Sequence, residues 1–155
     1  MDLLGQVAAL PGARLVIVGG GPAEAALRRA LPGAVFPGPK YGTELAEAYA
    51  SLDIFVHSGP RETFGQTLQE AAASGLPVVA PAAGGPRDIV TDGVTGYLVP
   101  PGVPGPLAAA VSRLVHDPAM RAAMGQAGRA KVAGRTWPVL GDELIGHYAE
   151  ILRHR

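Results

Sequence analysis

The chain has 155 residues, enough for one domain with a sizeable core, and its 48% hydrophobic and 17% charged residues are typical of a globular protein. Thirteen Lys and Arg residues balance thirteen Asp and Glu residues and are scattered, which argues against nucleic acid or an anionic membrane as partner. There is no cysteine for a disulfide or thiolate metal site, no signal-like leader, and no apolar run of the roughly 20 residues that cross a bilayer. The default expectation is a cytoplasmic protein, with peripheral association at the inner membrane surface left open.

Short apolar runs alternate with Ala-rich segments of helical period, and Gly or Pro stands at most junctions. The pattern predicts strands over residues 14–19, 34–38, 53–58, 77–81 and 96–100. It predicts helices over residues 21–31, 43–52, 64–75, 85–91, 104–116, 118–132 and 137–153. Apolar strands separated by helices indicate a parallel sheet covered on both faces, so we expect one doubly wound α/β domain over residues 1–155.

Two element boundaries have a clear physical basis. In "HDPAM", Asp117 is a candidate helix cap and Pro118 takes the first helical position, where its missing N–H costs nothing. In "SGLP", Gly75 is a candidate left-handed cap at the end of the preceding helix, and Pro77 opens the next strand.

Three glycines, Gly19, Gly20 and Gly21, end the first predicted strand in "VIVGGGPAEAAL". Ligands of open parallel sheets bind beyond the carboxyl ends of the strands, and glycine lets the backbone approach a phosphate closely. The spacing is not G-x-G-x-x-G, so a turn that merely connects strand and helix is an open alternative. A nicotinamide-dependent oxidoreductase is disfavoured, because "AVFPGPKYG" offers no acid for the adenosine ribose.

The stretch "RETFGQTLQEAAASGLPVVAP" places Glu62 in a loop and Glu70 inside the helix that follows. Glu70 is six residues past Phe64, about 9 Å along a helix axis. A diphosphate at the helix start would thus have one carboxylate on the loop side and another along the helix. Ionised carboxylates accept hydrogen bonds from paired sugar hydroxyls, so the arrangement suits a sugar nucleotide. On spacing alone, other interpretations stay open: Glu62 as a loop acid paired with Arg61 or placed near the helix dipole, and Glu70 as a solvated helical residue.

The segment "RETFGQTLQEAAASGLPVVAPAAGGPRDIVTDGVTGYLVPPG" resembles the donor-binding half of a large retaining glycosyltransferase family. This family has the two-Rossmann GT-B fold, carries an E-x7-E motif and is numbered four in the usual classification. The resemblance continues through "GARLVIVGGGP", "ELAEAYASLDIFVHSG" and the C-terminal helix "TWPVLGDELIGHYAEIL", and so covers nearly the whole chain. Within the family the chain is most similar to GDP-mannose-dependent α-mannosyltransferases.

The resemblance implies roles for individual residues. Glu62 would contact hydroxyls of the donor hexose, and Glu70 would hold the nucleotide ribose. The backbone at Phe64 and Gly65, helped by the Thr67 hydroxyl, would receive the diphosphate. The full set of donor-binding candidates is Gly19, Gly20, Gly21, Lys40, Arg61, Phe64, Gly65, Gln66, Thr67 and Glu70.

The implied mechanism is transfer with retention, without a metal or a cofactor beyond the donor. Positive groups would stabilise the departing diphosphate, and Glu62, the catalytic candidate, would position the sugar rather than form a covalent intermediate. Lys40 would lie near the nucleobase. His57 is more plausibly a structural residue than a catalytic one, Asp88 is expected at a helix start, and Arg87 is as plausibly a solvated charge.

The chain also departs from the family. Members carry a "GR...K" segment, whose Arg and Lys grip the diphosphate, and an N-terminal Rossmann domain for the acceptor; neither is present here, and Met1 would lie in the helix after that segment. The sheet would therefore lack its first, central strand, and the strands beside the gap would either pair directly or leave an exposed edge that invites homodimer formation.

Two functional classes stay open for a chain of this kind. One is the donor-binding part of a retaining glycosyltransferase with an unknown glycan or lipid-linked acceptor, which would not be active without its N-terminal acceptor domain. The other is a non-catalytic sugar-nucleotide-binding module or degenerate fragment. A nucleotide-sugar epimerase or phosphorylase fits the segment 62–96 less well.

Overall fold

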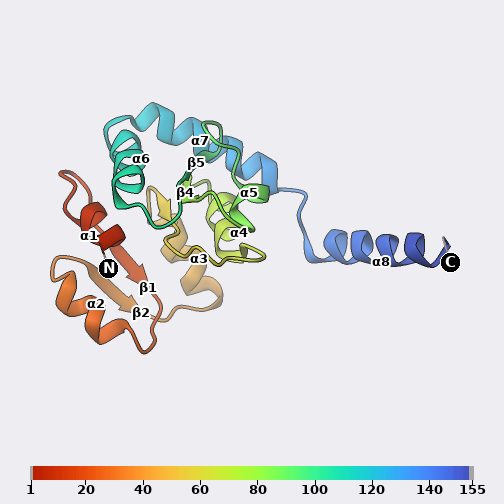
Figure 1. Ribbon diagram of the computed structural model, residues 1–155, viewed down its shortest axis with the longest axis horizontal. Coiled ribbons are helices and arrows are strands. Elements are labelled where there is room, and N and C mark those ends of the chain that lie inside the picture. Colours follow the sequence, from red (N-terminus) through yellow and green to blue (C-terminus); the bar gives the residue numbers. More distant parts are fainter. Residues whose placement is uncertain (1, 154–155) are drawn as a thin grey trace.

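A computed structural model describes residues 2–153 as an α/β fold (Figure 1). Its helices are α1 (Asp2–Ala8), α2 (Glu24–Ala30), α3 (Gly42–Ala50), α4 (Gln66–Ala73), α5 (Pro86–Ile89), α6 (Pro104–His116), α7 (Pro118–Val132) and α8 (Trp137–Arg153). Its strands are β1 (Val16–Val18), β2 (Val35–Gly38), β3 (Phe55–Val56), β4 (Val78–Pro81) and β5 (Gly96–Val99). Every strand and helix predicted from the pattern is present, and α1 is the additional helix that the family resemblance implied.

The strands form two separate parallel sheets rather than one continuous sheet. One has the order β1-β2 and the other the order β3-β4-β5. In the larger sheet Phe55 is paired with Val78, and Val78 in turn with Gly96. The strands predicted over 14–19 and 53–58 are shorter in the structure, at Val16–Val18 and Phe55–Val56.

Strand β4 is buried throughout and divides the hydrophobic core in two. Val79 faces a cluster built with α1, α6 and α7, which includes Val7 and Leu114. Val78 and Ala80, on the opposite face, pack with α3, α4 and α5. Alternate side chains of one strand therefore bury into both layers, as a parallel sheet covered by helices requires.

The two helix boundaries predicted from the sequence are confirmed, whereas Pro77 stands just before β4, which begins at Val78. Asp117 Oδ1 accepts a hydrogen bond of 2.8 Å from Met120 N, and so caps α7, in which Pro118 is the first residue. Gly75 adopts a φ of +80° just after α4, in the left-handed region that glycine enters without steric cost.

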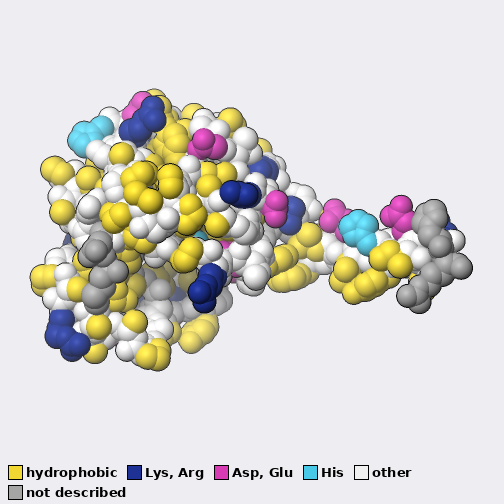
Figure 2. Space-filling view, in the orientation of Figure 1, with side chains coloured by type: hydrophobic (Ala, Val, Ile, Leu, Met, Phe, Trp, Pro, Cys, Tyr) yellow, Lys and Arg dark blue, Asp and Glu magenta, His cyan; other side chains and the backbone are white. Residues whose placement is uncertain are grey.

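Helix α8 extends away from the rest of the molecule (Figure 1). Most of its large apolar side chains are exposed, and Figure 2 shows hydrophobic side chains gathered along one edge of this helix. Within residues 2–153, the structure contains no helix that combines the length and hydrophobicity needed to cross a membrane.

Candidate functional site

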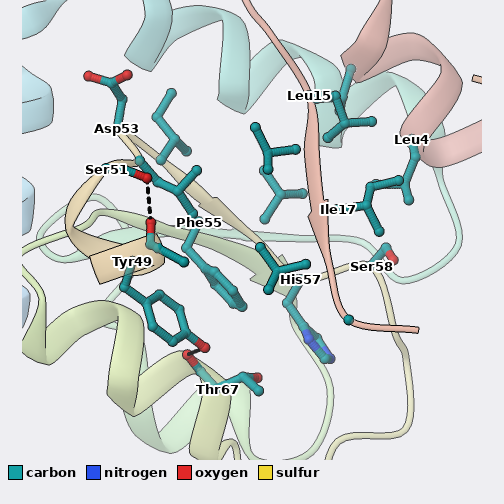
Figure 3. Close-up of a pocket in the computed structure, with 18 of the residues that line it drawn as sticks. Leu4, Leu15, Ile17, Tyr49, Ser51, Asp53, Phe55, His57, Ser58 and Thr67 are labelled. Atoms are coloured by element: carbon teal, nitrogen blue, oxygen red, sulfur yellow. Dashed lines mark hydrogen bonds between the residues drawn. The ribbon is translucent and has the colours of Figure 1, made fainter. Parts of the chain in front are cut away.

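A cavity of about 1290 Å³ lies between β1 and β3, where the sheet is interrupted (Figure 3). Figure 3 shows Leu4 from α1 with Leu15 and Ile17 on one side, and Tyr49 and Phe55 on the other. Many of the predicted site residues line the same cavity: Gly19, Gly20, Gly21, Lys40, Glu62, Thr67 and Glu70. The cavity thus joins an apolar part inside the fold to a polar part at the carboxyl ends of the strands.

The interruption corresponds to the position of the expected missing strand. Among residues 2–153, β1 pairs only with β2 and β3 pairs only with β4, so each strand keeps one edge without a strand neighbour. Residues of both strands line the cavity. Of the two outcomes expected for the missing strand, direct pairing across the gap does not occur, and the edges are left unpaired.

Glu62 lies in the loop before α4, and its carboxylate turns toward the start of that helix. Oε1 of Glu62 accepts a hydrogen bond of 2.8 Å from Gly65 N. Gly65 precedes α4 with a φ of +73°, a conformation that favours glycine, and a Cβ there would displace the Cδ1 end of the Ile89 side chain. The amide expected to receive a diphosphate is therefore occupied by a side-chain carboxylate.

The Glu62 loop rests on the glycines that precede α5. Gly85 N donates a hydrogen bond of 2.9 Å to Glu62 O. Side chains at Gly84 or Gly85 would overlap the carbonyl oxygens of Glu62 and Thr63. The "AGGPRD" segment is thus the backbone support for the loop that carries Glu62.

Glu70 is held by a hydrogen bond on each carboxylate oxygen. Tyr49 Oη donates to Oε2 at 3.1 Å, and Gln66 Nε2 donates to Oε1 at 3.0 Å. Tyr49 is buried, and its pKa is raised by desolvation first, then by the charge of Glu70 and the hydrogen bond to it. The phenol therefore keeps its proton and acts as a donor to Glu70 at neutral pH.

Some predicted residues lie apart from this cavity. Arg61, Phe64, Gly65 and Gln66 are not among its lining residues, and Phe64 stacks on Trp137 at the start of α8 with ring centroids 5.5 Å apart. Lys40 lines the cavity and forms an ion pair with Glu44, Nζ to Oε2 3.5 Å.

Three further residues were singled out in the sequence. His57 follows β3 and lines the cavity, and its Nε2 is buried without a hydrogen-bond partner among the described residues. Asp88 lies in the first turn of α5, the place expected for it, and Arg87 is exposed and donates to Ala82 O at 2.8 Å. Within residues 2–153, no group of three or more His, Asp or Glu residues is placed to hold a metal ion.

The sequence did not single out Tyr49, although it contacts Glu70 and lines the cavity. The available signal was its place on the apolar face of the helix in "ELAEAYA", four residues after Leu45. That pattern predicts a core position but not the polar contact of the hydroxyl, which joins residues 21 positions apart.

Parallel strands, helices on both faces and a polar cavity at the carboxyl ends define the class of open α/β proteins that bind ligands at this edge. Residues 2–131 match the family model "Glycosyl transferases group 1", and the chain belongs to this family. The family resemblance read from the E-x7-E segment is therefore confirmed.

The chain aligns over nearly its whole length with each of the relatives below, but it covers only part of their length. The chain is 54% identical over 156 residues to a GDP-mannose-dependent alpha-mannosyltransferase of Mycobacterium tuberculosis (strain CDC 1551 / Oshkosh), covering 100% of this chain and 40% of that protein. A sucrose-phosphate synthase structure from Thermosynechococcus elongatus has a TM-score of 0.84 at 28% identity, covering 99% of this chain and 42% of that chain. The Anabaena HepE structure in complex with UDP-glucose has a TM-score of 0.81 at 25% identity, covering 96% and 44%. The chain thus spans about 40% of the length of the mannosyltransferase that it matches.

Proposed function

We propose that this chain is the donor-binding part of a retaining glycosyltransferase that transfers mannose from GDP-mannose to an acceptor. The observation that best supports this proposal is that Glu62 and Glu70 line one cavity at the carboxyl ends of the strands, on either side of the start of α4. The similarity to GDP-mannose-dependent alpha-mannosyltransferases supports the choice of base and sugar. The acceptor would bind to protein outside this chain.

The proposed division of roles follows from the chemistry of the side chains. The two carboxylates accept hydrogen bonds from hydroxyls, Glu62 from the hexose and Glu70 from the ribose. The first amides of α4 and the positive end of its dipole would face the diphosphate, whose negative charge grows as the bond to the sugar breaks. No metal and no covalent protein intermediate is part of this proposal.

Donor binding would require one rearrangement at the start of α4. Glu62 now occupies the Gly65 amide, so its carboxylate would have to turn toward the sugar and leave that amide to a phosphate oxygen. An acidic side chain at a helix N-terminus is a stabilising substitute for a bound anion. Glu62 would thus exchange one set of hydrogen bonds for another when the donor enters.

The proposal is tested by calorimetric titration of the 155-residue chain with GDP-mannose and with GDP, using UDP-glucose as the comparison nucleotide sugar. We expect binding of both guanine ligands, weaker binding of UDP-glucose, and a loss of about tenfold or more in Glu70→Ala, because paired ribose hydroxyls lose a charged acceptor. Glu47→Ala is the matched control, since Glu47 is an exposed glutamate on α3.

Two outcomes would contradict the proposal. A folded chain that binds neither guanine ligand has no donor site, and equal affinity of Glu70→Ala and the unaltered chain would remove Glu70 from the site. Binding without mannosyl transfer, in a polypeptide that also contains an acceptor domain, would instead favour the non-catalytic sugar-nucleotide-binding module.

A further inference from the structure

Tyr49, on the neighbouring helix α3, touches the proposed ribose-binding carboxylate of α4. We propose that Tyr49 is a positioning residue for nucleotide recognition: its hydroxyl fixes the Glu70 carboxylate in the orientation that accepts hydrogen bonds from the ribose. This inference rests on the proposed function, since it concerns the use of Glu70 in the same site. Tyr49 itself is not proposed to touch the donor.

The hydrogen bonds around Glu70 leave part of the carboxylate free. Tyr49 Oη and Gln66 Nε2 each use one oxygen, at 3.1 and 3.0 Å, whereas an ionised carboxylate offers about four acceptor positions. The remaining positions can take two ribose hydroxyls. Because both oxygens are already held, the plane of the carboxylate is set before the ligand arrives, and less side-chain freedom is lost on binding.

Tyr49 is more rigidly placed than Gln66. Its side chain is 8% exposed and belongs to the core cluster that includes Leu68, and its ring lies 5.9 Å from that of Phe55. Gln66 is exposed and lies on the same helix as Glu70, so it moves with the residue it contacts. Tyr49, at the end of α3, is therefore the reference that fixes Glu70 relative to the rest of the cavity.

The hydroxyl also has a second acceptor close by. Thr67 O lies 3.4 Å from Tyr49 Oη, on the first turn of α4, and Figure 3 shows the phenol directed at this residue. The contact with Glu70 is shorter and involves a charge, so the single hydroxyl proton is directed mainly to the carboxylate. Burial raises the pKa of Tyr49 further, which keeps this proton in place at neutral pH.

The test is a protein-observed NMR titration of the full 155-residue chain and of Tyr49→Phe, which keeps the packed ring and removes only the hydroxyl. The two probes are GDP and 2′,3′-dideoxy-GDP, which lacks both ribose hydroxyls. We expect Tyr49→Phe to bind GDP about tenfold more weakly and to bind the dideoxy compound with unchanged affinity. Tyr148→Phe, at an exposed position on α8, is the matched control.

The preference for GDP over its dideoxy analogue separates positioning from folding, because a merely structural residue would weaken both ligands alike. In a Glu70→Ala background, Tyr49→Phe should cause no further loss. If Tyr49→Phe keeps the full preference for GDP over the dideoxy compound while Glu70→Ala loses it, the proposed role of Tyr49 is overturned and that of Glu70 is kept. If the unaltered chain shows no preference, or Glu70→Ala keeps it, the ribose role of Glu70 fails and this inference fails with it.

Discussion

Glu62 illustrates how a single side chain can serve the folded state and the proposed reaction in turn. In the structure its carboxylate accepts from Gly65 N at 2.8 Å, ahead of a helix whose first amides have no partners within the helix. The same amide is the one that a phosphate oxygen would use. The stability of the empty protein and the proposed affinity for the donor therefore both depend on Glu62, through different hydrogen bonds.

Replacing Glu62 should show its contribution to the stability of the empty protein. We expect Glu62→Ala to lower the free energy of unfolding by about 1 kcal/mol, because it removes an acceptor from a part-buried amide. Glu62→Gln should lose less, since the amide oxygen still accepts. Urea unfolding followed by circular dichroism measures both, and a Glu62→Ala protein as stable as the unaltered chain would mean that the hydrogen bond contributes nothing.

At the level of the elements, the helix boundaries are set by local chemistry that operates without the rest of the fold. Asp117 and Pro118 begin α7, and Gly75 follows α4, in the manner expected from their conformational preferences. Helix α7 packs against α4, which carries Glu70, so its cap supports the site indirectly.

The cap of α7 gives a prediction at this scale. Asp117→Ala should lower the free energy of unfolding by about 1 kcal/mol, because Met120 N loses its acceptor and the helix dipole loses a negative charge at its positive end. Asp142→Ala, at an exposed position on α8, should have a much smaller effect in the same denaturation experiment. Equal effects of the two substitutions would contradict a capping role.

For helix α8, the sequence pattern predicts the helix but not what its apolar face contacts. Leu144, Ile145, Tyr148, Ile151 and Leu152 recur at helical spacing and are all more than half exposed. The periodicity predicted the helix over residues 137–153, and the observed helix covers Trp137–Arg153. It did not predict that the apolar side chains would lie away from the core, because periodicity says which residues share a face and not what that face contacts.

For the molecule as a whole, the main feature is the interruption between the two sheets. Phe55 N donates to Pro77 O, just before β4, at 3.0 Å, and His57 N donates to Val79 O in β4 at 2.9 Å. Because successive amides of a strand point to opposite sides, the amide of Val56 points toward the cavity instead. The free edges of β1 and β3 are places where another strand could pair, and the expected homodimer through an exposed edge stays a prediction.

Hydrogen exchange measured by NMR can test the interruption directly. We expect the amide of Val56 to exchange much faster than that of Val79, which lies in the middle strand of the larger sheet with neighbours on both sides. Comparable protection at both positions would mean that the edge is covered. If that protection grew with protein concentration, the cover would be a second copy of the chain.

The order and type of the elements could be read from the sequence because each depends on nearby residues. The apolar strands bounded by Gly and Pro, the capping residues and the helical periods all act over a few positions. The candidate site could be proposed from the sequence because part of it lies on one continuous segment: Glu62, Thr67 and Glu70 occur within nine residues and line one cavity.

Contacts between distant segments were decided only by the tertiary structure. The sequence determined an α/β chain with a glycosyltransferase-like segment at the start of α4, because periodicity, turn chemistry and motif spacing are local properties. Packing decided that Tyr49 would meet Glu70 across two helices, that Glu62 would occupy the Gly65 amide, and that the sheet would divide between β1 and β3. Each of these depends on which surfaces come together, and burial and unpaired edges become defined only when the whole chain has folded.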